Sequence, residues 1–357
     1  MADRLTWRIV GVASLLIVPI MAWSLAASQD DPSVRDAEMK PKASRSLLLD
    51  IARTDAGYVV VGERGHILVS GDGRSWQQVK VPTRSTLTTV SSQGALVWAA
   101  GHDGVILHST DSGKTWKRQR TDPWSAESSS SSNGSPVLDT LFLNANEGYA
   151  VGAYSLLLKT VDGGATWTQL SVGSALPQPD TAAVASDTGV FDEGDLTLAA
   201  ESDPHLNAIT RTASGKLLVM GERGAGFVSA DSGANWRQIR LPYGGSVFGL
   251  LSLGGERVLA FGLRGNVFQS DDAGGSWRKL ESGTENSLIG GTVSADGSIL
   301  LAGSNGTVSF NRKGTGTFVS RQIRLANGQV PAFTAALGDA GVYILTSDLG
   351  AINSKVQ

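Results

Sequence analysis

Cysteine is absent from this chain of 357 residues, which has only four histidines and 18% charged residues. The absence of cysteine excludes disulfides, thiolate nucleophiles, haem attachment and zinc–thiolate sites, and four scattered histidines do not suit a metal centre. The formal net charge of -3 argues against a nucleic-acid binder. Nucleotide loops, metalloprotease helices and nucleophile elbows are also missing at suitable places, so we expect no metal and no cofactor.

The amino terminus has the pattern of an export segment. The run from Ile9 to Ala27 carries no charge, follows Arg4 and Arg8, and is succeeded by Ser28. This pattern predicts either a cleaved secretion signal or an uncleaved membrane anchor over residues 1–28. In both cases the remaining chain is expected in the periplasm or an equivalent compartment, either soluble or anchored to the inner membrane.

Internal repetition is the main feature of the remaining sequence. Tryptophans at positions 76, 116, 167, 236 and 277 are separated by 40, 51, 69 and 41 residues. A period of about 40 residues leaves insertions at about 121–136 and 172–205. Each repeat contains four short apolar segments with turns between them, which is typical of a propeller blade. In the first repeat the segments are Leu47–Ile51, Tyr58–Val61, His66–Val69 and Gln77–Val81.

Each tryptophan ends a polar motif that resembles the Asp-box, or BNR repeat. One copy is Ser109-x-Asp111-x-Gly113-x-Thr115-Trp116. Its Asp and Ser/Thr oxygens can accept backbone N–H groups inside a hairpin, and the tryptophan can pack between blades. A carboxylate at such a turn could also be catalytic or bind calcium, but its repetition favours a structural role. The motif residues are Asp72, Asp111, Asp162, Asp231 and Asp272, with Trp76, Trp116, Trp167, Trp236 and Trp277.

These repeats predict an all-β, seven-bladed propeller over residues 47–357. The carboxyl-terminal part, Phe333 to Lys355, supplies only three strands of the seventh blade. Residues 29–46 are a linker, and we expect its segment Asp31–Ser44 to add the missing strand, because that would close the ring and cover an open sheet edge.

A second turn motif, Gly-x-x-Gly, lies between the second and third strands, on the face opposite the boxes. Arginine at its third position offers a charged fork for carboxylates, phosphates or an acidic protein surface. Alternatively, each arginine pairs with a neighbouring carboxylate and only solvates its turn. The third-position residues are Arg64, Asp103, Tyr154, Arg223, Arg264, Asn305 and Leu349.

The insertion at 172–205 has seven acidic residues and no Lys or Arg. Its connections place it on the face of the Gly-x-x-Gly turns. It could compete with a partner for the arginines, or it could be a solvated linker loop.

The export segment, the Asp-box blades, the Gly-x-Arg-Gly turns and the segment His205–Ile209 resemble the photosystem II assembly and stability factor family over nearly the whole mature chain. The resemblance implies a monomeric propeller that is not an enzyme and that docks a membrane protein or complex. Arg64, Arg223 and Arg264 would dock this partner, with Tyr154 and Asp103 at equivalent positions. Similar proteins occur in non-photosynthetic bacteria, often linked with exporters of the resistance-nodulation-division class, and we expect this chain to be one of them.

Two other functions remain open from the sequence. Asp-boxes also occur in sialidases, and three arginines with Tyr154 are similar to the residue set of a sialidase-like glycosidase. The Phe/Tyr-Arg-Ile/Leu-Pro motif of those enzymes is absent near the chain start. A glycan-binding module would need aromatic rings exposed on the arginine face, for which Trp124 and Tyr154 are the candidates.

Overall fold

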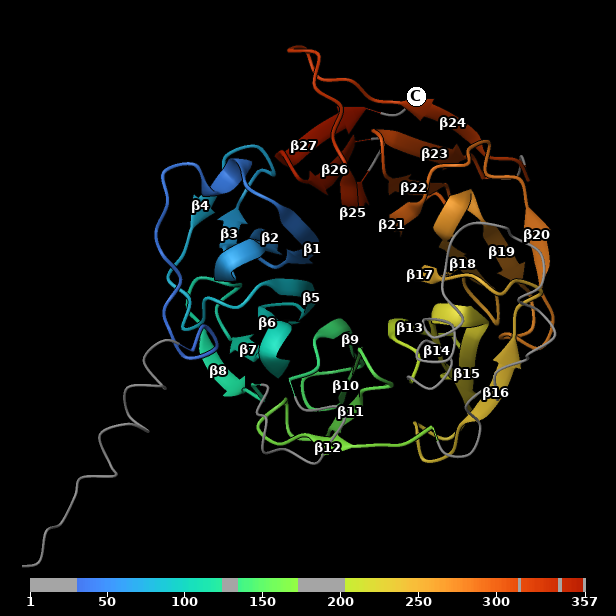
Figure 1. The fold of residues 1–357 in the computed structure, drawn as a ribbon, viewed down its shortest axis with the longest axis horizontal. Helices are drawn as coiled ribbons and strands as arrows, with labels where there is room; N and C mark the ends of the chain where they lie inside the picture. Colours follow the sequence, from blue (N-terminus) through green and yellow to red (C-terminus); the bar gives the residue numbers. More distant parts are fainter. Residues whose placement is uncertain (1–30, 124–133, 173–202, 314–315, 340–341, 356–357) are drawn as a thin grey trace, which may run out of the picture.

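The computed structural model describes residues 31–123, 134–172, 203–313, 316–339 and 342–355. In this part of the chain, seven antiparallel sheets surround a central axis, which confirms the predicted seven-bladed propeller (Figure 1). The expected signal or anchor, residues 1–28, lies outside the described residues. The described residues contain no helix long and apolar enough to cross a membrane.

In each blade, the first strand lies at the centre of the ring and the last strand lies at its rim (Figure 1). Blades 1 and 2 contain β1 (Leu48–Thr54), β2 (Gly57–Gly62), β3 (Ile67–Ser70), β4 (Gln77–Gln78), β5 (Leu87–Gln93), β6 (Leu96–Gly101), β7 (Ile106–Ser109) and β8 (Lys117–Arg120). Blades 3 and 4 contain β9 (Val137–Phe142), β10 (Gly148–Gly152), β11 (Leu157–Thr160), β12 (Thr168–Gln169), β13 (Leu206–Arg211), β14 (Leu217–Gly221), β15 (Ala225–Ser229) and β16 (Arg237–Arg240).

The remaining blades continue the same order around the ring. Blades 5 and 6 contain β17 (Val247–Ser252), β18 (Val258–Gly262), β19 (Val267–Ser270), β20 (Arg278–Leu280), β21 (Leu288–Val293), β22 (Ile299–Gly303), β23 (Thr307–Asn311) and β24 (Val319–Gln322). Blade 7 contains β25 (Phe333–Asp339), β26 (Val342–Ser347) and β27 (Gly350–Lys355).

Apolar side chains between neighbouring blades form the core. The second strands are apolar on both faces because each sheet is covered on both sides, and Val59, Val60 and Val61 of β2 are fully buried. Between blades 2 and 3, the buried Trp98 ring stacks on Phe142 at 3.6 Å between ring centroids. The five box tryptophans belong to hydrophobic clusters that also contain residues of the preceding blade.

The box of blade 3 shows how these motifs stabilise their hairpins. The Asp162 carboxylate accepts hydrogen bonds from the Thr166 hydroxyl at 2.6 Å and the Thr166 N–H at 2.9 Å. The Thr160 hydroxyl donates to the same carboxylate at 2.8 Å. The two bonds from Thr166 are the largest of the effects that lower the pKa of Asp162 to about 2. All three bonds lie within the hairpin and favour the ionised carboxylate.

Acidification is expected to weaken the boxes. The five box aspartates have a pKa lowered to about 2; in Asp111 burial opposes this effect, but the hydrogen bonds from Thr115, Ser109 and Lys114 together outweigh it. A depressed carboxyl pKa stabilises the fold above the unfolded pKa of about 4, and this stabilisation is lost as the pH falls to about 2. Asp162→Asn should therefore lower the melting temperature at pH 6, and the difference should vanish near pH 2.

Melting followed by circular dichroism measures this effect. The exposed Asp271 accepts one solvent-exposed bond from the Gln269 amide at 2.6 Å and approaches Arg278 at 3.8 Å, so the control Asp271→Asn is expected to change the melting temperature little. If Asp162→Asn lowered the melting temperature by the same amount down to pH 2, the stabilisation could not come from the ionised Asp162 carboxylate.

Each innermost strand contains a β-bulge after its first residue, and side chains at these bulges join neighbouring blades. The Asn207 amide of blade 4 donates to the Val247 carbonyl of blade 5 at 2.9 Å. The Thr334 hydroxyl of blade 7 donates to the Leu48 carbonyl of blade 1 at 2.7 Å. The bulges thus connect blades by hydrogen bonds at the centre of the ring.

Blade 7 has three strands, and Asp31–Ser44 does not add a fourth one, so this expectation is corrected. The segment instead follows the outer edge of blade 1. The Ala37 N–H donates to the Val81 carbonyl at 2.9 Å, and the Lys40 N–H donates to the Gln78 side chain at 2.7 Å. These contacts hold the segment away from the position of the missing strand.

The ring closes by direct packing of blade 7 on blade 1. β1 contacts β25 and β26, and the Asn353 amide donates to the Gly73 carbonyl at 2.9 Å. A short 3-10 helix, η1 (Ala43–Arg45), contacts the first part of β27. Each blade is therefore built from one uninterrupted stretch of the chain.

Candidate docking face

The turns between the second and third strands share one face with the connections between blades. We call this surface the turn face, and the opposite surface, which carries the Asp-boxes, the box face. In every blade, the second residue of the turn donates its N–H to a carbonyl just before the innermost strand; in blade 4, Glu222 donates to His205 at 3.0 Å. The seven turns begin at Gly62, Gly101, Gly152, Gly221, Gly262, Gly303 and Ser347.

Glycine at the first position permits this close approach. A Cβ at Gly221 would lie 1.8 Å from the His205 oxygen, and at the other five glycines the corresponding distance is no more than 2.2 Å. At these six glycines no side chain fits without moving backbone atoms. We call this combination of the close approach and the N–H bond the backbone clamp. The backbone clamp fixes the turn relative to the sheet.

The third residue of six turns has a left-handed backbone, with φ between 54° and 56°. This conformation is uncommon for residues with a Cβ and costs roughly 1–3 kcal/mol. It persists because the backbone clamp determines the path of the turn. Five of these side chains are exposed on the turn face: Arg64, Tyr154, Arg223, Arg264 and Asn305.

The three arginines do not converge on one point. Arg223 and Arg264 lie on the neighbouring blades 4 and 5, whereas Arg64 lies on blade 1, across the ring (Figure 1). Among the described residues, no carboxylate forms an ion pair with Arg64 or Arg264. Their charges are thus available on two separate parts of the turn face.

The surroundings of Arg64 are positively charged. Arg84 pairs with Glu38 at 3.0 Å, and Lys40 pairs with the same carboxylate. A hydrogen bond and the charge of Lys40, followed by the charges of Arg84 and Arg64, lower the pKa of Glu38. With Glu63 in the turn itself, three cations are accompanied by two carboxylates, so this part of the turn face keeps a net positive charge.

Aromatic and acidic groups accompany the arginine of blade 4. The Tyr154 ring, 45% exposed, meets the His205 ring edge-on at 5.2 Å between centroids. The Glu222 carboxylate accepts the His205 N–H at 3.2 Å and lies 3.7 Å from its Nδ1. Glu222 thus orients the residue against which Tyr154 packs, beside Arg223.

Two positions singled out in the sequence have other surroundings. The half-buried Asp103 accepts the Ser85 hydroxyl at 2.6 Å, so its carboxylate holds the connection between blades 1 and 2. The Leu349 side chain is half-buried beside Ser44 and Arg45. Trp124 and most of the acidic insertion 172–205 lie outside the described residues.

The sequence analysis missed two carboxylates in the inner strands. Asp50 follows the bulge of blade 1 and accepts the Val90 N–H of blade 2 at 2.7 Å. Asp139 follows the bulge of blade 3 and accepts the Ile209 N–H of blade 4 at 2.9 Å. The repeated apolar-Leu-Asp order at the start of repeats 1 and 3 was the available signal.

Burial raises the pKa of Asp50 to about 6 and that of Asp139 to about 7, to which the charge of Asp50 also contributes. A carboxyl pKa above its unfolded value of about 4 favours the fold at low pH and penalises it as the pH rises through the folded pKa. The melting temperature should therefore fall by on the order of 5 °C between pH 5 and pH 8.

The double variant Asp50→Asn/Asp139→Asn tests by calorimetry whether these two carboxyl groups cause the fall. We expect the melting temperature of the double variant to change much less between pH 5 and pH 8, because an amide does not titrate. An unchanged slope in the double variant would assign the pH dependence to other groups.

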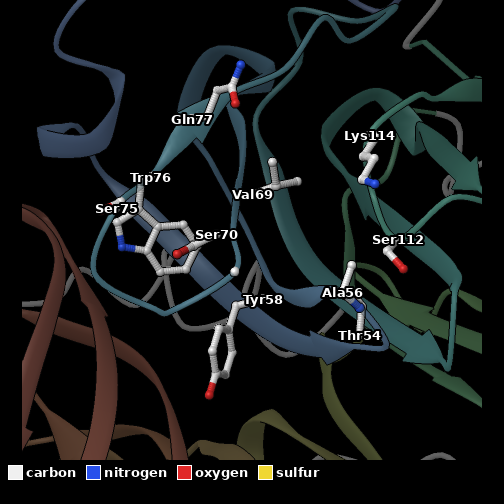
Figure 2. A pocket seen from close by; sticks show the side chains of 11 residues that line it. Thr54, Ala56, Tyr58, Val69, Ser70, Ser75, Trp76, Gln77, Ser112 and Lys114 are labelled. Carbon is white, nitrogen blue, oxygen red and sulfur yellow. The ribbon is translucent and has the colours of Figure 1, made fainter.

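Hollows on the surface do not assemble a catalytic set. Figure 2 shows one of about 300 Å³ on the box face, bordered by Tyr58, Trp76, Ser112 and Lys114. A hollow of about 610 Å³ beside Arg264 is bordered by Lys279, Glu281 and Glu285. In the described ranges, no group of three or more acidic or histidine side chains could hold a metal ion.

Comparison with known proteins agrees with the repeat pattern and the ring. A family model described as photosynthesis system II assembly factor YCF48 matches residues 38–124 and 119–324. The chain belongs to the YCF48 family. Membership of this family of assembly factors supports a role in binding and assembly rather than catalysis. No curated protein sequence matches the chain.

Solved structures share the fold at low sequence identity. A structure described as YCF48 bound to D1 peptide has a TM-score of 0.62 and 16% identity, covering 91% of this chain and 100% of that one. YCF48 from Cyanidioschyzon merolae has a TM-score of 0.59 and 15% identity, covering 89% and 97%. The WD40 propeller domain of Doa1 also reaches a TM-score of 0.62, at 12% identity and covering 91% and 97%.

Proposed function

We propose that this chain is an exported, non-catalytic propeller that docks a membrane protein or membrane complex through its turn face and assists its assembly or stability. The observation that carries the proposal is the set of exposed Arg64, Arg223 and Arg264 side chains on rigid left-handed turns, in a member of the YCF48 family. A guanidinium group offers a planar, always charged fork that matches carboxylates on a partner, and a turn whose backbone is already fixed needs no ordering on binding. YCF48 bound to a D1 peptide supports a client of this kind.

The course of the amino-terminal segment supports a membrane-facing orientation. The Arg84 N–H donates to the Pro32 carbonyl at 2.7 Å, so Pro32 lies against a connection between blades on the turn face. An uncleaved anchor at residues 1–28 would direct this face toward the membrane, whereas a cleaved signal would release the propeller into the periplasm. In a non-photosynthetic bacterium, an exporter of the resistance-nodulation-division class is a client of this kind.

The separation of the arginines argues against a sialidase. An arginine triad that binds one substrate carboxylate must converge on it, whereas Arg64 lies across the ring from Arg223 and Arg264. Among the described residues, Tyr154 is the one aromatic ring in the set of exposed large hydrophobic side chains. A sugar-binding platform would ordinarily use more than one such ring.

Affinity purification from detergent-solubilised membranes of the native host tests the docking role. The unaltered protein should retain a specific membrane protein, and the variant Arg64→Glu/Arg223→Glu/Arg264→Glu should lose it. Because exposed charges speed association and are screened by salt, binding of the client by the unaltered protein should also weaken as the salt concentration is raised.

A matched control carries the same charge change on the other face. Lys114, Lys117 and Arg237 are exposed beside the boxes of blades 2 and 4, and their change to glutamate should leave client binding intact. Equal loss in both triple variants would indicate a general charge effect. Equal retention by both would show that the turn-face arginines do not dock the client.

A further inference from the structure

Among the residues that the structure describes, no strand pairs with the outer edge of the last strand of blade 7. The third strand of each other blade is paired with a fourth strand, but β27 is the last strand of its sheet. The strands β3, β7, β11 and β19 have three buried residues of four, whereas Gly350 is the one buried residue among the six of β27.

Alternate backbone groups of β27 point away from β26. Antiparallel pairing joins Ile352 to Leu345 and Asn353 to Ile344, and such pairs alternate between the two edges of a strand. The Lys355 carbonyl accepts the Arg321 guanidinium of blade 6 at 3.0 Å, so Lys355 belongs to the outward-facing set. By alternation, the N–H and C=O groups of Ala351 and Asn353 face outward as well.

A groove of about 610 Å³ adjoins the first part of this edge, where Leu349 and Ala351 border it. Its walls combine apolar groups with two exposed arginines, Arg45 from η1 and Arg74 from the box of blade 1. The residues that border it include no Asp or Glu, and among the described residues neither arginine forms an ion pair. The apolar part of the lining comprises Trp76, Leu325, Leu349 and Ala351.

We propose that the open edge of β27 is a strand-addition site for an extended acidic peptide segment of a partner protein. The peptide backbone would pair with the outward groups of β27 as a fourth strand. Acidic side chains on one face of the peptide would meet Arg45 and Arg74, and apolar side chains on the other face would contact the groove. This site lies at the rim of the ring and is separate from the turn-face arginines.

Residues 33–40 of the chain's own linker do not compete for this edge, because their contacts with blade 1 hold them along its outer strand. Gln78 donates to the Glu38 carbonyl at 2.9 Å and accepts the Lys40 N–H at 2.7 Å. The Arg118 guanidinium donates to the Ser33 carbonyl at 3.1 Å. The charge of the groove then favours an acidic occupant over a basic one.

Fluorescence anisotropy with the full chain tests the site. The probe is a labelled peptide of about eight residues in which valine alternates with glutamate, the length of an ordinary strand. We expect saturable binding, at least about tenfold weaker when alternate peptide N–H groups are methylated. Replacing glutamate by lysine should also weaken binding, and Arg45→Glu/Arg74→Glu should reverse this preference.

Two variants at one position isolate the backbone edge. Asn353→Ala and Asn353→Pro both lose the side-chain bond to Gly73, but only proline removes the outward N–H, at an edge position where proline is tolerated. Asn353→Ala should bind the probe normally, and Asn353→Pro at least about tenfold more weakly. Circular dichroism of both variants shows whether the fold is intact.

Three outcomes would overturn the proposal: equal binding of the methylated peptide, equal binding by Asn353→Pro, or no saturable binding by the unaltered chain. A concentration-dependent dimer in sedimentation that dissociates in Asn353→Pro would also overturn it, because a second copy would then occupy the edge. The triple variant Arg64→Glu/Arg223→Glu/Arg264→Glu should bind the peptide within about twofold of the unaltered chain. This separates failure of this site from failure of the turn-face function.

Discussion

Replacing Trp98 by alanine is expected to lower the free energy of unfolding by about 3–5 kcal/mol. The Trp98 side chain is fully buried and stacks between His108 at 4.8 Å and Phe142 at 3.6 Å, and its N–H donates to the Gly163 carbonyl at 2.8 Å. The substitution removes the ring that joins blade 2 to blade 3 and leaves a cavity. The urea midpoint of unfolding measures the loss.

Trp98→Phe separates the contributions of packing and hydrogen bonding. Phenylalanine keeps an aromatic ring against Phe142 but leaves the Gly163 carbonyl without its donor, so we expect a smaller loss of about 1–3 kcal/mol. A loss below about 1 kcal/mol for Trp98→Ala would show that the junction between blades 2 and 3 is not held by this ring.

Gly221→Ala is expected to destabilise the fold by about 3 kcal/mol and to weaken docking at the turn face. The added Cβ would overlap the His205 carbonyl oxygen at 1.8 Å and would lie 3.0 Å from the Leu206 Cα, both of which are backbone atoms. Relief requires the turn to separate from the chain segment before β13, which breaks the bond from the Glu222 N–H to His205. Arg223 would then lose its fixed orientation.

Gly244→Ala is the matched control on the same face. A Cβ at Gly244 would meet no heavy atom within 4 Å, so the added methyl group should be tolerated. Chemical denaturation and client binding of the two variants measure both effects. Similar stabilities would contradict the backbone clamp as the feature that fixes the turns.

The blade count could be predicted because the repeat pattern reports local geometry. Each box fixes a hairpin through bonds between residues at most four positions apart, as between Asp162 and Thr166, and each Gly-x-x-Gly turn marks a backbone approach that excludes a Cβ. Such short-range constraints are visible in sequence. The strands of the seventh blade could be assigned in the same way, including the absence of the fourth.

The linker could not be placed from its sequence, since distant contacts determine its course. Asp31–Ser44 has no strand pattern that favours β27 over blade 1, and the choice depends on groups such as the Val81 carbonyl and the Gln78 side chain. The roles of Asp50 and Asp139 in the inner strands could not be predicted for a similar reason. An aspartate near the start of a strand suggests a solvated edge, whereas Asp50 and Asp139 bind backbone N–H groups of the next blade.

The position of the three arginines around the ring followed from their repeat numbers, but their environment did not. Glu222 is next to Arg223 in sequence and suggested a simple charge pair. In the structure its carboxylate also holds His205, because the chain segment before β13 lies directly against the turn. Contacts between turns and connections thus determine how each arginine is presented.

Because every blade is one uninterrupted stretch of chain, a coding segment of about 40 codons corresponds to one complete wedge of the ring. Duplication or deletion of such a segment adds or removes a wedge without dividing a sheet between the two ends of the gene. The same arrangement brings Leu48 and Thr334 together where the last blade meets the first. A change in the number of wedges therefore requires new contacts at one junction between blades only.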